Sequence, residues 1–147
     1  MDERERWNAY YASRVNIYED RPHPFLRHHL ALLPRGRALE LAMGEGYNAM
    51  FLARQGFSVT GIDISAVAVE RSVQLSQEAG VAIDAQCMDL RTTTLPADTY
   101  DVVACFYYLL SAKKPVPSGH EHTEAGWYGN LRDVYRRASA IWPSHEP

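Results

Sequence analysis

Residues 37–46 read Arg-Ala-Leu-Glu-Leu-Ala-Met-Gly-Glu-Gly, an apolar run that ends in a turn with two glycines. The run predicts a buried strand, and the glycines at 44 and 46 remove two Cβ atoms where the chain must turn sharply. A helix is predicted to follow from about Tyr47 to Gln55. A turn of this kind, before a helix N-terminus, lets a ligand approach the backbone. The stretch therefore predicts a ligand site at the carboxyl end of this strand.

The chain on both sides of this stretch alternates between strand and helix patterns. Further strands are predicted over residues 57–62, 81–87 and 100–106, and helices over 2–13, 24–33 and 66–79. Ser65 is expected to cap the last of these helices, in which Ala66, Val69 and Val73 share a face. Because this alternation is typical of parallel βαβ units, the sequence predicts an α/β fold.

Three acidic residues lie at or near the ends of the predicted strands. Glu40 lies in an apolar strand, where a lone charge is costly, so a functional role is favoured over a surface role. Asp63 ends the second strand, where a carboxylate can accept both hydroxyl hydrogens of a ribose, although it could merely cap the next helix. Asp89 could meet an adenine amino group, although loops are rich in Asp for turn reasons alone. The pattern predicts a nucleoside pocket.

Two ligand classes fit such a pocket. The letters Gly44-x-Gly46-x-x-Ala49 also satisfy the dinucleotide fingerprint, with Asp63 at about the expected distance. The additional acids Glu40 and Asp89 suit a nicotinamide dinucleotide less well than they suit S-adenosylmethionine, which we therefore expect as the cofactor.

The order of these motifs resembles that of class I S-adenosylmethionine-dependent methyltransferases, over about residues 20–110. Within that superfamily, residues 38–49 and 59–65 look most like the small bacterial tellurite-resistance-type methyltransferases. Residues 22–26, 100–103 and 105–109 strengthen the likeness. The resemblance implies a Rossmann-like sheet with the strand order 3-2-1-4, incomplete at the C-terminal side. It also implies methyl transfer to a small-molecule acceptor, such as a chalcogen oxyanion or a thiol.

The resemblance also assigns roles to individual residues. Glycines 44 and 46 would pack under the methionine part of the cofactor, and Glu40 would help to position its amino group. Asp63 would bind the ribose, and Ile64 would cover one face of the adenine. Asp89 and the backbone of Leu90 would meet the edge of the adenine. Phe106 would lie near the transferred methyl group. No catalytic residue is predicted.

Two residues depart from the pattern of the family. Ala42 stands where the family often has Gly, and it is still expected at the cofactor. Met43 stands where the family often has Cys, and its larger side chain puts the shape of the pocket in question. The N-terminal aromatic residues Trp7, Tyr10 and Tyr11 are expected either to cover the cofactor or to serve packing alone.

The C-terminal part of the chain has a different character. Residues 1–110 are expected to hold the N-terminal helices and the cofactor domain, and residues 111–147 an atypical tail with one helix over about 130–141. No fifth strand is predicted, so the fourth strand would present an unpaired edge through which copies could form a homo-oligomer. Three interpretations stay open: an active methyltransferase, a cofactor-binding remnant without turnover, or, as the least favoured, a nicotinamide dinucleotide enzyme.

Composition narrows the possible partners and location. Fifteen Lys+Arg against 18 Asp+Glu give a net charge of -3, which argues against nucleic acid as a partner. No window approaches the roughly 20 apolar residues that cross a bilayer, and the charged N-terminus is unlike a secretory signal. We therefore expect a cytoplasmic protein without membrane contact.

The potential metal ligands and cysteines predict little chemistry. His120 and His122 lack a fourth ligand at finger spacing, so a solvated loop is favoured there and no metal site is predicted. Cys87 and Cys105 are expected to be buried. In the implied strand order they lie on strands about 14 Å apart, too far for a disulfide.

Overall fold

The computed structural model describes residues 1–14, 21–106 and 139–141. Its sheet contains five parallel strands in the order β3-β2-β1-β4-β5. The predicted 3-2-1-4 order is confirmed. The strands are β1 (Arg37–Leu41), β2 (Ser58–Asp63), β3 (Asp84–Cys87), β4 (Val102–Cys105) and β5 (Ser139–Ile141).

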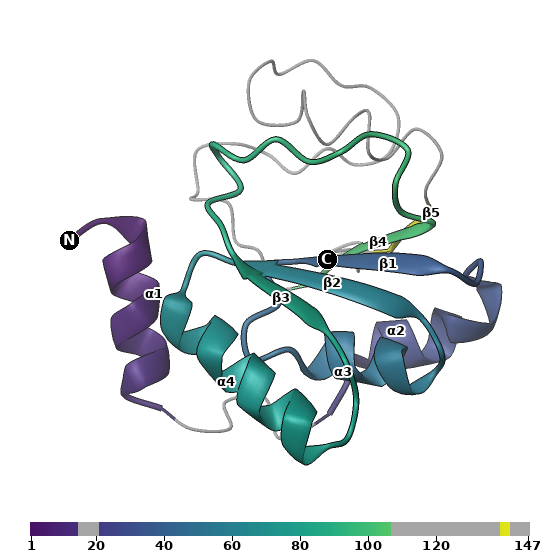
Figure 1. Cartoon of the computed structure of the whole chain (residues 1–147), viewed down its shortest axis with the longest axis horizontal. Coiled ribbons are helices and arrows are strands. Elements are labelled where there is room, and N and C mark those ends of the chain that lie inside the picture. Colours follow the sequence, from purple (N-terminus) through teal and green to yellow (C-terminus); the bar gives the residue numbers. More distant parts are fainter. Residues whose placement is uncertain (15–20, 107–138, 142–147) are drawn as a thin grey trace, which may run out of the picture.

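The helices cover one face of this sheet. In Figure 1, α2, α3 and α4 lie on the same side, α1 stands beside α4, and residues 88–101 run over the opposite side. The helices are α1 (Glu3–Ala12), α2 (Pro24–His29), α3 (Tyr47–Arg54) and α4 (Ala66–Glu78), and a 3-10 turn (Leu30–Leu32) follows α2. The four helices match the predicted ones to within a few residues.

Alternate residues of β1 enter two separate cores. Ala38 packs on the helix side with Leu26 and Leu52, whereas Leu39 packs on the opposite side with Leu95. Side chains of a strand alternate between faces, so Glu40 shares the helix side with Ala38. The fold therefore places this carboxyl group in an apolar layer, beside the start of α3.

The expectation of an unpaired edge at β4 is wrong. β5 pairs with β4 in parallel, with Val102 opposite Ser139 and Ala104 opposite Ile141. The helical spacing of apolar residues over 130–141 concealed this strand, which has only three residues and no run of β-branched side chains. A homo-oligomer through the edge of β4 loses its structural basis, because β5 occupies that edge.

Two smaller expectations about burial are also wrong. Cys87 is exposed, whereas Cys105 is half-buried, because β3 is an edge strand with no fully buried residue. On α4 the buried residues are Ala68, Ser72 and Ser76, whereas Ala66 and Val73 are exposed and Val69 is half-buried. Ser72 and Ser76 can pack on the buried face of α4 because each hydroxyl donates to a backbone carbonyl of its own helix.

Candidate cofactor site

The loop between β1 and α3 contains three residues with positive φ. These are Ala42 (+53°), Gly44 (+57°) and Gly46 (+83°). Gly46 is the N-cap of α3 and provides no side chain to cap the helix. The backbone N–H of Met43 donates to the Ile62 carbonyl at 3.0 Å, which fastens the loop to β2. The loop therefore presents backbone and the start of a helix at the carboxyl ends of the strands.

The two glycines leave space that neighbouring elements use. A Cβ on Gly44 would lie 2.5 Å from the Tyr11 hydroxyl, and a Cβ on Gly46 would lie 3.0 Å from Cβ of Ser72. Tyr11 is only 5% exposed, so α1 lies directly against the glycine loop. This contact fits both expected roles of the N-terminal aromatic residues, covering the site and packing.

Asp63 joins the ends of β1 and β2. Its Oδ2 accepts the backbone N–H of Gly44 at 2.8 Å, and its Oδ1 accepts that of Ser65 at 2.8 Å. Burial raises the pKa of Asp63, and the N–H groups of Ser65 and Gly44 oppose that rise. Asp63 thus organises the loop in addition to any contact with a ligand, while Ser65 caps α4 as predicted.

Glu40 is the most unusual group in the site. It is 2% exposed, and Oε1 accepts the Asn48 side-chain amide at 2.9 Å. Its Oε2 is buried and has no hydrogen-bond partner among the described residues. Burial raises the pKa of Glu40 to about 8; Asn48 and the backbone N–H of Ala49 oppose this, and the charge of Asp63 adds to it. A buried oxygen without a partner is costly unless a ligand supplies a donor.

Asn48 connects Glu40 to the segment before α2. Its Oδ1 accepts the backbone N–H of His23 at 2.7 Å. The His23 ring stacks on Phe106, with 4.8 Å between the ring centroids, and burial lowers the pKa of His23. Phe106 is 8% exposed at the end of β4. The two stacked rings form a wall at the end of β4, and Asn48 connects the backbone of His23 to the loop.

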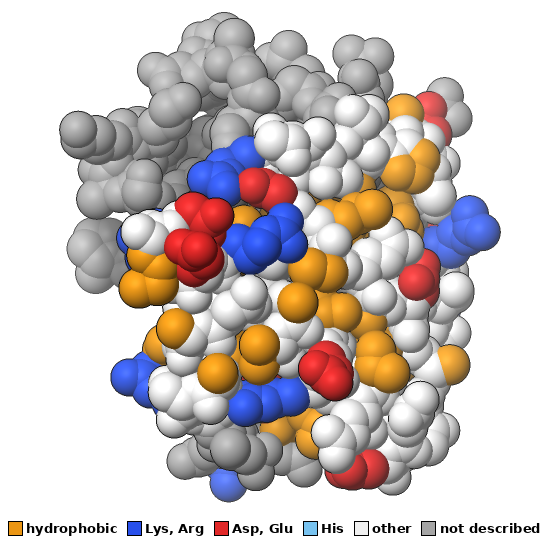
Figure 2. Space-filling view, turned by 60° about the vertical axis from the view of Figure 1, so that its left-hand side comes forward, with side chains coloured by type: hydrophobic (Ala, Val, Ile, Leu, Met, Phe, Trp, Pro, Cys, Tyr) orange, Lys and Arg blue, Asp and Glu red, His pale blue; other side chains and the backbone are white. Residues whose placement is uncertain are grey.

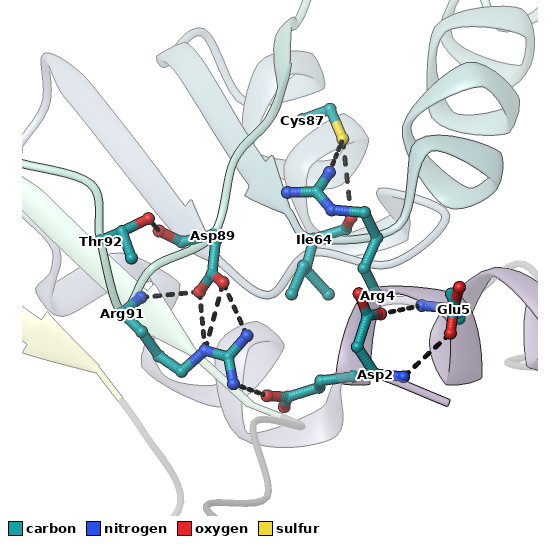
Figure 3. A network of polar contacts seen from close by, with 9 residues as sticks. Asp2, Arg4, Glu5, Ile64, Cys87, Asp89, Arg91 and Thr92 are labelled. Carbon is teal, nitrogen blue, oxygen red and sulfur yellow. Dashed lines mark hydrogen bonds and ion pairs between the residues drawn. The ribbon is translucent and has the colours of Figure 1, made fainter.

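Asp89 lies in a network of charged side chains that includes α1 (Figure 3). Arg91 bonds both oxygens of Asp89, and its Nη1 lies 2.8 Å from Oε2 of Glu3. The hydrogen bond from Arg91 lowers the pKa of Asp89. The carboxylate of Asp89 already has a charged partner, unlike that of Glu40.

The same network reaches the end of β3. Arg4 donates from Nη1 to Sγ of Cys87 at 3.3 Å, and the Cys87 thiol donates to the Ile64 carbonyl at 3.6 Å. Ile64 and Leu90 are half-buried beside it. The contacts of Glu3, Arg4 and Tyr11 place α1 across the ends of the strands.

The Met43 side chain packs against β2. It is 6% exposed, and its Sδ lies where a Cβ on Gly61 of β2 would be. The extra volume of Met43 is therefore accommodated by the missing side chain at Gly61. The side chain still contributes to the pocket wall.

A pocket opens at the glycine loop. Tyr11, Arg21, Ala42, Met43, Gly44, Glu45, Tyr47 and Asn48 line it. Tyr11 was expected either to cover the cofactor or to serve packing, whereas Arg21, Glu45, Tyr47 and Asn48 were not among the predicted cofactor residues. The sequence does single out Asn48, because it is a polar residue within the otherwise mostly apolar run that follows Gly46.

The structure brings most of the predicted site together. Glu40, Ala42, Gly44, Gly46 and Asp63 meet at the ends of β1 and β2, through the loop and the bond from Gly44 to Asp63. Asp89 and Leu90 follow β3 separately. The metal candidates His120 and His122 lie outside the described residues. Within the described residues, no group of three or more His, Cys, Asp or Glu could hold a metal ion.

The surface charge and the helices of the described residues bear on possible partners. Figure 2 shows acidic and basic side chains next to one another on the face turned toward the viewer. None of the helices in residues 1–14 and 21–106 is long and apolar enough to cross a bilayer.

Sequence comparisons identify relatives of the chain. A family model described as a methyltransferase domain matches residues 38–119, more than half of the chain. The chain is 26% identical over 130 residues to Hemagglutinin 1 of Eikenella corrodens, covering 85% of this chain and 42% of that protein. It is 27% identical over 77 residues to the ubiquinone biosynthesis O-methyltransferase of Coxiella burnetii, covering 52% and 33%. The chain thus spans less than half the length of these relatives.

Solved structures share the fold. A protein described for the conversion of a disulfide bond into a thioacetal group during echinomycin biosynthesis superposes with a TM-score of 0.64 at 23% identity, covering 71% of this chain and 46% of that chain. TehB from Haemophilus influenzae superposes with a TM-score of 0.56 at 17% identity, covering 68% and 34%.

Proposed function

Since the chain belongs to the methyltransferase domain family, we propose that it binds S-adenosylmethionine and transfers its methyl group to a small-molecule acceptor. When bound, this cofactor supplies a methyl group on a sulfonium centre, which is already strongly electrophilic. The protein then has to hold the cofactor, align the nucleophile and exclude water, effects that can supply roughly 7 to 11 kcal/mol. Methyl transfer needs no dedicated base unless the nucleophile arrives protonated.

The observation that carries the proposal is Oε2 of Glu40, which is buried and has no hydrogen-bond partner in the part of the chain that the structure describes. An ammonium group donates hydrogen bonds and carries the charge that a buried carboxylate requires. The amino group of the cofactor provides such a cation. We assign Glu40 to this group, and the backbone at Ala42, Gly44 and Gly46 to the rest of the methionine part.

The nucleoside part is assigned to the ends of β2 and β3. The oxygens of Asp63 accept the backbone N–H groups of Gly44 and Ser65, and a carboxylate oxygen has lone pairs for further donors, here the ribose hydroxyls. Ile64 would cover one adenine face, and Asp89 with the backbone of Leu90 would meet its edge. Because Arg91 holds both oxygens of Asp89, this last contact requires sharing or displacing Arg91.

The acceptor would lie beside Phe106, against the wall formed by Phe106 and His23. We propose a thiol or a chalcogen oxyanion such as tellurite or selenite, on the basis of the resemblance to tellurite-resistance-type methyltransferases. Arg21 lines the pocket at the glycine loop, where its charge suits either an anionic acceptor or the carboxylate of the cofactor. A nucleic acid substrate fits poorly with a net charge of -3.

Calorimetry with S-adenosylhomocysteine, S-adenosylmethionine and NAD tests the cofactor assignment. We expect micromolar binding of the two sulfur compounds and none of NAD, and a loss of at least tenfold in affinity in Glu40→Gln. Glu78→Gln on the exposed surface of α4 serves as the matched control and should bind as the unaltered protein does. Binding of NAD alone would contradict the proposal and favour the dinucleotide fingerprint.

Methyl transfer is tested separately. Labelled S-adenosylmethionine is supplied with dithiothreitol, selenite or tellurite, and the methylated product is measured. Product formation that Glu40→Gln reduces supports the enzyme. Cofactor binding with no product from any of these acceptors would favour the remnant without turnover.

A further inference from the structure

Asn48 is buried in the first turn of α3 and bonds two different parts of the site. Its Oδ1 accepts the backbone N–H of His23 at 2.7 Å, and its Nδ2 donates to Oε1 of Glu40 at 2.9 Å. A backbone N–H can only donate, so the atom that faces His23 must be the carbonyl oxygen. The amide nitrogen is then fixed toward Glu40, and the orientation of Asn48 follows from its partners.

One end of this amide acts on Glu40. Because Nδ2 engages Oε1, Oε2 is the oxygen that has no partner among the described residues. The amide hydrogen bond and the backbone N–H of Ala49 favour the ionised carboxylate, whereas burial and the charge of Asp63 on β2 oppose it. Asn48 therefore affects which oxygen is left for a ligand and how readily Glu40 ionises.

The other end of the amide acts on His23, before α2. Nδ1 of His23 accepts the backbone N–H of Phe25 at 3.1 Å, which caps α2. With both its backbone and its ring held, His23 stacks on Phe106. Asn48 thus connects the carboxyl group assigned to the cofactor with the wall assigned to the acceptor.

We propose that Asn48 is a positioning residue for methyl transfer, which leaves Oε2 of Glu40 to receive the ligand's ammonium group and fixes the wall of His23 and Phe106. The inference rests on the proposed function. It predicts that removal of the amide changes how ligand affinity depends on pH, because an ammonium ligand binds the ionised form of Glu40.

Calorimetric titration with S-adenosylhomocysteine from pH 6 to 8.5 provides the test. In the unaltered protein the affinity should rise by up to about tenfold per pH unit and level off near pH 8. Asn48→Leu removes the donor while keeping the volume and the dry surroundings, so the rise should continue through pH 8.5. The affinity for 5′-methylthioadenosine, which lacks the ammonium group, should stay flat in both proteins.

A control and a second variant keep the test decisive. Gln74→Leu removes another amide-to-carboxylate hydrogen bond, on the surface of α4, and should keep the unaltered profile. Asn48→Asp keeps the acceptor for His23 but places a second carboxylate beside Glu40. Two adjacent carboxylates share one proton, so the pair carries one negative charge throughout this range. The affinity of this variant should therefore not rise between pH 6 and 8. Asn48→Asp therefore tests the positioning role even if Asn48→Leu does not fold.

The outcomes separate the inference from the proposed function. Asn48 variants that weaken binding by the same factor at every pH would overturn the positioning role, since a structural role predicts that result. An unaltered protein that binds no S-adenosylhomocysteine would overturn the proposed function itself.

Discussion

The backbone N–H of Gly44 donates a 2.8 Å hydrogen bond to Oδ2 of Asp63, which is 19 residues further along the chain. This bond joins the loop after β1 to the end of β2. A residue expected to bind a ribose therefore also holds the glycine loop in place. Stability and ligand affinity should respond together when Asp63 is changed.

Asp63→Ala removes the partners of two backbone N–H groups, those of Gly44 and Ser65. Leaving buried donors unsatisfied costs about 1 to 3 kcal/mol each, partly relieved by loss of the buried charge. We expect a net loss of about 2 kcal/mol in the free energy of unfolding, measured by urea denaturation, and at least a tenfold loss in affinity for S-adenosylhomocysteine. Asp84→Ala on exposed β3 is the control and should change neither. Unchanged stability in Asp63→Ala would contradict the linking role.

Ala42→Gly should stabilise the protein. Ala42 has a φ of +53°, and a left-handed conformation costs an L-residue with a side chain roughly 1 to 2 kcal/mol. Part of that gain is lost because glycine is freer in the unfolded chain, so we expect about 0.5 to 1 kcal/mol in urea denaturation. Ala53→Gly, in the helical backbone of α3, should destabilise by about 1 kcal/mol. Loss of stability in both variants would exclude strain at Ala42.

Gly61→Ala should destabilise the protein through Met43. The new Cβ would occupy the position of Sδ of Met43, and overpacking of this kind costs about 1 to 3 kcal/mol. Met43→Cys, which restores the residue that the family often has, should rescue Gly61→Ala. The double variant measured by thermal unfolding should therefore be more stable than Gly61→Ala alone. Additive losses would show that the two positions do not compete for space.

The stability of the protein should fall as the pH rises toward 8. The pKa of Glu40 is raised from 4.5 to about 8 in the folded protein, so the folded state keeps a proton that the unfolded chain releases between these values. The free energy of unfolding then decreases with rising pH across this window and levels off above it. Asp63, whose pKa is also raised, contributes in the same direction.

Glu40→Gln isolates the contribution of Glu40. Its free energy of unfolding, from urea denaturation at pH 6, 7 and 8, should decline less with pH than that of the unaltered protein, by up to about 1.4 kcal/mol per pH unit. Glu78→Gln, on the surface of α4, should retain the full slope. Equal slopes in Glu40→Gln and the unaltered protein would show that Glu40 stays ionised throughout.

The sequence predicts those parts of the fold that depend on residues close together in the chain. The apolar run before Gly44, the cap at Ser65 and the acid at the end of β2 each reflect neighbours in sequence, and together they located the loop and Asp63. β5 could not be predicted, because three residues give almost no periodicity and their pairing with β4 is distant in sequence. The exposure of Cys87 depends on β3 lying at the edge of the sheet.

The remaining site residues owe their roles to long-range contacts. Tyr11 reaches Gly44 from another helix, and Asn48 reaches back to His23 across 25 residues. Neither contact leaves a periodic pattern. The unpartnered oxygen of Glu40 likewise appears only once α3 is packed against β1, although the cost of a lone acid in an apolar strand had already indicated a special role.

The role of Glu40 is best tested by a crystal structure with S-adenosylhomocysteine bound. We expect the ligand's ammonium nitrogen within about 3 Å of Oε2 of Glu40, with the ribose hydroxyls at Asp63. A ligand seated elsewhere, or one whose ammonium group bonds other residues while Oε2 stays unpartnered, would contradict it.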